Sequence, residues 1–203
     1  MNIFNDINDK LADESLCWKN KPDKWAILNN NQISITAPES TDFFNDPGGE
    51  VCQNAPFLFT YVTNDDFVCT TRVSVDFKSE YDTGCIMLVV DEENWCRVGY
   101  EVVNGDLKIV SVVNKATSDD CDSQIIGDAV PYLRITKKGN LMAMHYSLDG
   151  KAWPLVRYFN LARYSDKMKL GVTSLCLTGK ACTSKFDFLE YEAESVEDIL
   201  ECK

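Results

Sequence analysis

Three side chains able to bind a polar ligand alternate along the segment Trp95 to Glu101. Side chains of a β-strand point to opposite faces in turn, so Trp95, Arg97 and Glu101 share one face. An aromatic ring, a cation and an anion make a poor apolar core but a good floor for a polar groove. Arg97 and Glu101 are four residues, or ~13 Å, apart at ~3.3 Å per residue. The spacing therefore predicts that they do not pair directly and that each needs a partner from a neighbouring strand.

Candidate partners come from the segments that should flank this strand. A face with planar donors, acceptors and a ring suits a polyol, whose hydroxyl groups need hydrogen bonds while its carbon skeleton needs a flat apolar surface. Either Trp95 or Phe44 would supply that surface. The alternative is a sheet surface of salt bridges that binds no ligand. The predicted groove consists of Asp42, Phe44, Asp82, Trp95, Arg97, Glu101, Asn114 and Arg134.

No catalytic residue is assigned from the sequence. A glycoside hydrolase needs two carboxyl groups about 5–10 Å apart, and the Glu-x-Asp-x-x-Glu run of the sandwich glucanases is missing. Asp82 and Glu101 stay open as a pair across two strands. His145 is the only histidine, and we expect it to make one structural hydrogen bond. Nucleotide-binding glycine motifs are absent, which leaves no cofactor to predict.

A calcium site is the remaining alternative for chemistry. The acidic residues that would serve it lie in two segments, but the spacing of a calcium loop is missing, and no metal site is predicted. These residues are Asp42, Asp46, Asp119, Asp120 and Asp122.

The elements that must position these residues are strands. Residues 81–114 indicate three consecutive strands, with Asn104-Gly105 as the strongest hairpin signal. Short alternating segments with turn signals recur along the chain and predict roughly 11–13 strands, which is typical of a β-sandwich or barrel. Residues 41–56 and 115–130 are predicted loops, and a hairpin turn is expected at 29–32. Short helices are expected only near the termini, at 5–14 and, as an alternative to a frayed tail, at 196–203.

Composition limits the partners. The chain has 203 residues, 45% of them hydrophobic, and a formal net charge of -12. Such a surface repels phosphate backbones and anionic lipids, so we expect neither nucleic acid nor membrane as a partner. The nine cysteines include no CxxC pair, and neither a signal peptide nor an apolar run of ~20 residues is present. These features predict a reduced, cytoplasmic protein, and no linker divides residues 1–203 into more than one domain.

The order of several short motifs is similar to that of a known family. The chain resembles an uncharacterised family of concanavalin-A-like jelly-roll proteins, whose fungal members are labelled regulation of enolase protein, over about residues 16–190. The resemblance implies two curved antiparallel sheets, a concave polar groove, a cytoplasmic protein and a link to enolase, without established catalysis. The motifs are Trp18-x-Asn20-x-Pro22, Thr41-Asp42-Phe43-Phe44, Ala55-Pro56, Asp66-Phe67, Tyr81-Asp82-x-Gly84, Trp95-x-Arg97-x-Gly99-x-Glu101, Val112-Val113-Asn114 with Ser118-Asp119, Leu133-Arg134, and Asp149-Gly150-x-x-Trp153 with Arg157.

The chain departs from the family pattern at groove positions. Phe44 and Asp120 stand where the family has tryptophan, and Thr83 stands where it has glutamine. Arg97 replaces a lysine, which keeps the charge and changes its geometry. These changes would weaken sugar stacking and hydrogen bonding.

Three function hypotheses follow. The leading one is a non-enzymatic cytoplasmic regulatory or binding protein, resembling regulators of enolase, with a groove for a carbohydrate or another small polar ligand. The second is a glycan-active enzyme or lectin-like module that uses Asp82, Arg97 and Glu101. The third is an interaction protein whose convex acidic face contacts a partner.

Overall fold

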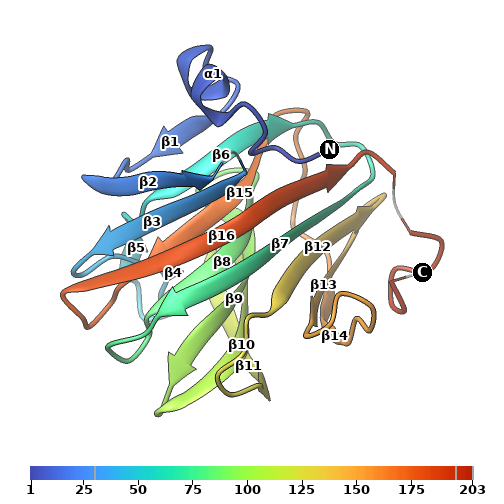
Figure 1. Cartoon of the computed structure of the whole chain (residues 1–203). Coiled ribbons are helices and arrows are strands. Elements are labelled where there is room, and N and C mark those ends of the chain that lie inside the picture. The colour runs from blue at the N-terminus through green and yellow to red at the C-terminus, as the bar shows by residue number, and fades with distance from the viewer. Residues whose placement is uncertain (30, 195, 203) are drawn as a thin grey trace.

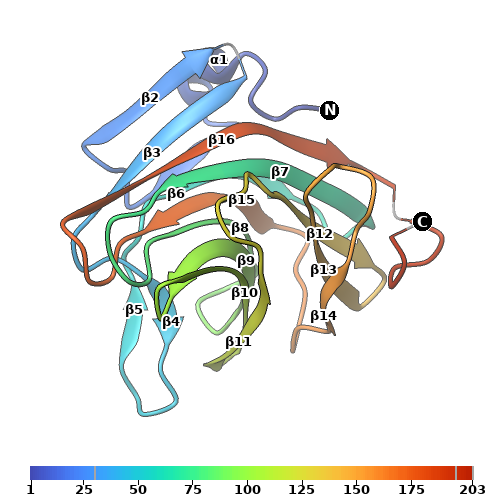
Figure 2. The same ribbon diagram turned by 60° about the horizontal axis from the view of Figure 1, so that its bottom comes forward.

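The protein folds into two stacked antiparallel sheets of seven strands each and a separate two-stranded hairpin (Figure 1). The computed structural model describes residues 1–29, 31–194 and 196–202. Both sheets are curved, and Figure 2 shows their strands as nested arcs, with one sheet on the outside of the other. An all-β sandwich of two curved antiparallel sheets is therefore confirmed.

The inner sheet carries the strand on which the predicted groove is centred. Its strands are, in spatial order, β1 (Cys17–Lys19), β6 (Phe57–Val62), β15 (Met168–Leu175), β8 (Thr83–Val89), β9 (Asn94–Val103), β10 (Asp106–Lys115) and β11 (Thr117–Ile125).

The outer sheet covers the convex side. Its strands are, in spatial order, β14 (Leu155–Phe159), β13 (Leu141–Ser147), β12 (Tyr132–Lys138), β7 (Phe67–Asp76), β16 (Ala181–Glu192), β3 (Gln32–Pro38) and β2 (Lys24–Asn29).

The main core lies between the two sheets. Strand alternation places Ile86, Val98 and Leu170 of the inner sheet against side chains of the outer sheet such as Ile35 and Phe186, all of them buried. All residues of β8 are buried, since one face of this strand meets the main core and the other meets a second apolar cluster beneath the hairpin.

The hairpin occupies a segment that the sequence predicted as a loop. β4 (Phe43–Asn45) pairs with β5 (Val51–Gln53) within residues 41–56. It covers part of the concave face of the inner sheet, where Phe43 packs against Phe57 and Trp95. The glycines, proline and acidic residues that indicated a loop form the turn of this hairpin.

The prediction of a loop at residues 115–130 was also wrong, because nine residues of this segment form the edge strand β11. Most of its side chains are exposed, so the segment lacks the apolar alternation that marks a strand. With these additions the described residues contain sixteen strands, more than the 11–13 predicted.

The termini fit the expectation of little helix. A six-residue helix, α1 (Ile7–Ala12), lies within the predicted segment 5–14. Residues 196–202 form turns instead of the alternative helix, and they lie against the outer sheet, where Lys138 Nζ donates to the carbonyl groups of Val196 and Glu197. Residue 203 of that segment and residue 30 of the expected turn at 29–32 lie outside the described residues.

Candidate functional site

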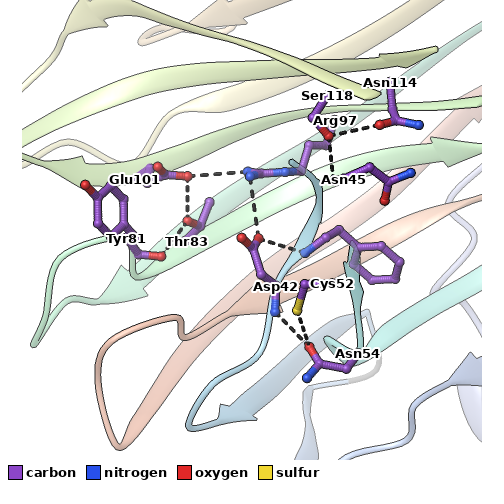
Figure 3. A network of polar contacts seen from close by, with 11 residues as sticks. Asp42, Asn45, Cys52, Asn54, Tyr81, Thr83, Arg97, Glu101, Asn114 and Ser118 are labelled. Carbon is purple, nitrogen blue, oxygen red and sulfur yellow. Dashed lines mark hydrogen bonds and ion pairs between the residues drawn. The ribbon is translucent and has the colours of Figure 1, made fainter. Parts of the chain in front are cut away.

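A buried arginine between two carboxylates forms the centre of the site (Figure 3). Arg97 Nη1 donates to Glu101 Oε2 at 3.4 Å, and Arg97 Nη2 lies 3.7 Å from Asp42 Oδ1. The prediction that Arg97 and Glu101 do not pair was wrong. The estimate of ~13 Å measured the separation along the backbone and ignored two long side chains that lie along the strand toward each other.

The strand itself explains why Arg97 and Glu101 can pair directly. The residue between Arg97 and Glu101 on the same face is Gly99, which places no side chain in the path of the guanidinium. A Cβ at Gly99 would lie 2.8 Å from Cγ2 of Thr83 and 3.0 Å from Cβ of Cys85. The Thr83 hydroxyl then fixes the far end of the pair by donating to Glu101 Oε2 at 2.7 Å.

Burial makes this cluster electrostatically unusual. Arg97 and Glu101 are 4% and 6% exposed. Loss of solvation raises the pKa of the Glu101 carboxyl, and the nearby Arg97 charge offsets that rise only in part. Desolvation likewise raises the pKa of Asp42 against the pull of Arg97. For Arg97 burial acts to lower the pKa, but the two carboxylates outweigh it and raise the pKa.

The cluster lies in a cavity of about 360 Å³ on the concave side of the inner sheet. Its polar lining includes the carboxylates of Asp42, Asp46, Glu101, Asp120 and Asp122. Its apolar lining includes Phe44, Tyr81, Val103, Val110, Val112 and Leu177. Four of the predicted groove residues, namely Asp42, Phe44, Arg97 and Glu101, therefore meet in one place.

The hairpin delivers Asp42 and Phe44 to this cavity. Asn54 Oδ1 accepts from the Asp42 backbone N–H at 2.9 Å, so the two arms of the hairpin segment hold each other. On the other side Ser118 Oγ accepts from the Asn45 backbone N–H at 2.8 Å and donates to Asn114 Oδ1 at 2.9 Å. Asn114 is fully buried in this link and does not line the cavity. The structure thus gives Asn114 a role in positioning the hairpin.

Trp95 is not a surface for a ligand. The residue is fully buried, and its ring meets Phe43 edge-on with 6.3 Å between ring centroids. Alternation correctly placed Trp95 on the same face as Arg97, but the hairpin covers that end of the face. Phe44, which is half-buried, and Tyr81, which is 40% exposed, are the aromatic side chains that reach the cavity.

Asp82 and Arg134 lie elsewhere. Asp82 is fully buried, and its Oδ2 accepts from the backbone N–H groups of Lys78 and Ser79 at 2.9 and 3.0 Å, so it holds the turn before β8. The pair of Asp82 with Glu101 that the sequence left open is not formed, because Asp82 points into its own turn. Arg134 belongs to the outer sheet and stacks on Trp153, with 3.5 Å from the guanidinium carbon to the ring centroid.

His145 matches its predicted structural role. It is fully buried in β13, and its Nε2 lies 3.2 Å from the Leu200 carbonyl oxygen of the C-terminal segment. Burial lowers the pKa of the imidazole and so favours the neutral form of His145, which lies in the outer sheet away from the cavity.

Several cavity residues escaped the sequence reasoning. Tyr81 and Thr83 belong to a quoted motif, but nothing in the pattern indicated that their side chains face Glu101. Asp120 and Asp122 were considered as calcium ligands, and Asp120 also as the replacement of a family tryptophan, but the strand that carries them was predicted as a loop. Their i, i+2 spacing was the one signal that both face the same side of a strand.

The chemistry of the cavity follows from this inventory. Arg97 provides donors, the carboxylates provide acceptors, and Phe44 and Tyr81 provide flat apolar surface. Within residues 1–29, 31–194 and 196–202, no three His, Cys, Asp or Glu side chains are grouped so as to hold a metal ion. None of the helices described there has the length and apolar character needed to span a membrane.

Comparison with known proteins places the chain among relatives of the same fold. A protein of Saccharomyces cerevisiae (strain ATCC 204508 / S288c) named "Regulation of enolase protein 1" is 28% identical over 141 residues, which cover 69% of this chain and 71% of the relative. A solved structure described as a functionally unknown protein from Saccharomyces cerevisiae has a TM-score of 0.83 and 25% identity, and the match covers 90% of this chain and 98% of that one.

Two other solved structures share the fold alone. A GH43 protein of Bacillus licheniformis has a TM-score of 0.73 at 14% identity, over 89% of this chain and 37% of that one. An alginate lyase from Klebsiella pneumoniae has a TM-score of 0.55 at 12% identity, over 84% of both chains. These matches agree with the jelly-roll sandwich that the sequence predicted.

The family assignment rests on the extent of the sequence match. The family described as "Protein of unknown function (DUF1349)" matches residues 18–194, nearly the same region as the resemblance noted from the motifs. The chain therefore belongs to the DUF1349 family.

Proposed function

We propose that this chain is a non-enzymatic regulatory protein whose concave cavity binds a carbohydrate or another small polar ligand. The observation that carries this proposal is the environment of Arg97. This residue is only 4% exposed, yet it lines an open cavity. Its Nη2 lies 3.7 Å from Asp42 Oδ1, which is longer than a hydrogen bond, so Asp42 does not fully engage this donor. Its Nε is enclosed and has no hydrogen-bond partner among the described residues. A buried cation with unused donors is costly unless a ligand completes its hydrogen bonds.

The remaining lining suits a sugar. Carboxylates such as Asp42 and Asp120 accept hydrogen bonds from hydroxyl groups, and the rings of Phe44 and Tyr81 can cover the apolar face of a sugar ring. A cavity of about 360 Å³ is within the size range of small-ligand sites, which is about 300–1,000 Å³.

The link to enolase is a second part of the proposal. It is supported by the name of the yeast relative, at 28% identity over most of both chains. Purified enolase should bind this chain directly, or the catalytic activity of enolase should change when this chain is added. The nine free thiols fit a reducing compartment such as the cytoplasm. Burial of both Phe4 and Ile199 favours one domain over residues 1–203.

A thermal-shift screen against mono- and oligosaccharides tests the binding proposal. A ligand of the folded state raises the melting temperature by mass action. The hit should lose most of its shift in Asp42→Asn and Glu101→Gln, which keep the shape of each side chain. Asp119→Asn is the matched control, because Asp119 lies next to Asp120 on β11 but pairs with Arg157. A hit unaffected by both cavity variants, or no hit at millimolar concentration, would refute a ligand site here.

A glycan-active enzyme remains the second candidate, on one observation. Burial raises the pKa of both Asp42 and Glu101, as expected for a carboxyl group that must hold a proton as a general acid. In that case Glu101→Gln would abolish release of reducing sugar while leaving substrate binding in place. Wild-type protein that binds a sugar and releases no product over prolonged incubation supports the non-enzymatic function.

A further inference from the structure

We propose that the cavity accepts neutral or amino sugars stacked on Tyr81 and rejects sugars that carry a phosphate or a carboxylate. This inference rests on the proposed function, since it names the class of ligand for the same site. It draws on the charge of the lining, on the distribution of lysines over the sheet and on the backbone of Tyr81.

The lining is strongly acidic. Five carboxylates and one guanidinium line the cavity, and the guanidinium is already shared between Asp42 and Glu101. A further cation of the same sheet, Lys108, pairs with Asp122 at 3.0 Å. An anionic group entering here meets uncompensated negative charge in a partly desolvated space, where like charges repel most strongly. Arg97 Nη2, which at 3.7 Å from Asp42 Oδ1 makes no hydrogen bond to it, can still donate to a neutral hydroxyl group.

Three other lysines lie in the other half of the same sheet. Lys19, Lys167 and Lys169 belong to β1, to the segment before β15 and to β15. Their ammonium groups lie over the rings of Phe43, Tyr61 and Phe59, at 5.4, 4.2 and 5.5 Å from the ring centroids. The sheet therefore separates its charges, and none of these lysines is in the lining of the cavity.

Tyr81 is held in an unfavourable backbone conformation at the edge of this cavity. Its φ of 65° lies in the left-handed region, which is uncommon for a bulky side chain. Its N–H donates to the Val102 carbonyl at 2.9 Å, and its carbonyl oxygen lies 3.0 Å from the Thr83 hydroxyl oxygen. The surroundings thus fix a strained residue whose ring is 40% exposed. Strain retained at a ligand site points to a function for the side chain, here a stacking surface.

The charge test uses matched sugars. Glucose, galactose and mannose are each compared with their 2-amino sugar, uronic acid and 6-phosphate by calorimetry at low and high salt. We expect the parent or amino sugar of at least one series to bind, and its uronic acid and 6-phosphate to bind about tenfold or more weakly at low salt. The difference should shrink at high salt, which screens repulsion between partly exposed charges.

The outcomes separate the two proposals. If no member of any series binds at millimolar concentration, the proposed function fails together with this inference. If a 6-phosphate or uronic acid binds as tightly as its parent, the cavity remains a binding site and the charge selectivity is refuted. Asp120→Lys should reduce the difference in affinity between the parent sugar and its 6-phosphate. Asp119→Lys, on the same edge strand, should leave that difference unchanged. Equal effects of the two variants would refute the role of the cavity charge.

The stacking test uses a variant that suits the backbone. Asparagine tolerates the left-handed region better than tyrosine, so Tyr81→Asn should fold with an unchanged or higher melting temperature. It should weaken sugar binding about tenfold, or about 1.4 kcal/mol, through loss of the stacking surface. Tyr158→Asn is the control, since Tyr158 is 45% exposed on the outer sheet. Unchanged affinity in Tyr81→Asn would refute stacking on this residue.

Discussion

Replacing Arg97 with methionine tests whether the three charges at the base of the cavity depend on one another. Methionine keeps an unbranched side chain but leaves Asp42 and Glu101 without their shared counter-charge. Removing one member of a buried ion pair costs about 3–5 kcal/mol, whereas a surface pair is worth about 0–1 kcal/mol. The side chains of Arg97, Glu101 and Asp42 are 5%, 8% and 13% exposed, so the buried value applies. Because the Asp42 carboxylate keeps some contact with solvent, we expect a loss of unfolding free energy at the lower end of this range, about 3 kcal/mol at pH 8.

The loss should depend on pH in a defined direction. The pKa values of Asp42 and Glu101 are already raised above their ordinary values of 3.8 and 4.5. Without Arg97 they rise further, so the folded state keeps protons that the unfolded state has released. Stability then falls as the pH rises from these ordinary values through the raised ones. The deficit of Arg97→Met should therefore be smallest near pH 5 and largest near pH 8.

Urea unfolding at pH 5 and pH 8 measures both quantities. With an m-value of about 3 kcal/mol/M, a loss of about 3 kcal/mol lowers the midpoint by about 1 M. The control is the neutral triple variant Asp42→Asn, Arg97→Met and Glu101→Gln, which should recover more than half of the loss because no buried charge remains. A deficit below about 1 kcal/mol at pH 8, or one that is equal at both pH values, would show that water solvates the carboxylates and would refute the reasoning.

Three further outcomes test the scaffold. Gly171→Ala should lower the unfolding free energy by several kcal/mol or prevent folding, since the new Cβ would lie 1.9 Å from the Leu58 carbonyl oxygen; normal urea unfolding would contradict this packing. Asp82→Ala should cost about 1.5–3 kcal/mol in the same assay by removing two charged hydrogen bonds, and sugar binding should be unchanged. Maleimide at pH 7.5 should label the exposed Cys121 first and at most four of nine thiols in the native protein, by intact mass. Burial raises the pKa of Cys85 to about 12, so early labelling there would contradict the core.

The strands that the sequence predicts best are those with one apolar face and a defined turn. Asn104 and Gly105 have φ values of 55° and 78°, as the two central residues of a type I′ turn require. The register of the hairpin they close then follows, and Glu101 lies opposite Lys108. Alternation and turn chemistry are local properties, so they can be identified in a single sequence.

The segments that were missed have no such local signal. β11 pairs with one neighbour only and exposes most of its side chains, so hydrogen bonds to β10 rather than apolar burial hold it. The turn residues Pro47, Gly48 and Gly49 dominate residues 41–56, although short strands flank them. Edge strands and short hairpins of this kind are specified by the surface they lie on, which the sequence does not reveal.

The same limit explains the site. Alternation correctly predicts that Trp95, Arg97 and Glu101 share one face of the strand. It does not predict which other segments of the chain cover that face. The first arm of the hairpin runs across that face, from Cys176 after β15 to Ser118 on β11, and divides it. At one end Phe43 seals Trp95 into an apolar cluster, and at the other end Asp42 reaches Arg97 while the floor beyond it stays open. The long polar side chains at the open end then pair over Gly99, which a distance along the backbone could not predict.

The hairpin thus has two functions that one set of contacts must satisfy together. The bridge between Thr41 and Cys176 fixes where the segment enters, and the bond from Asn45 to Ser118 fixes where it reaches the far edge. Between these anchors, Phe43 must point down into the core for Asp42 and Phe44, its neighbours, to face the cavity. A shift of one residue would bury the Asp42 carboxylate in the apolar cluster and expose the Phe43 ring. Stability of the core therefore selects the geometry of the site, because the alternative register would bury a charge far from Arg97.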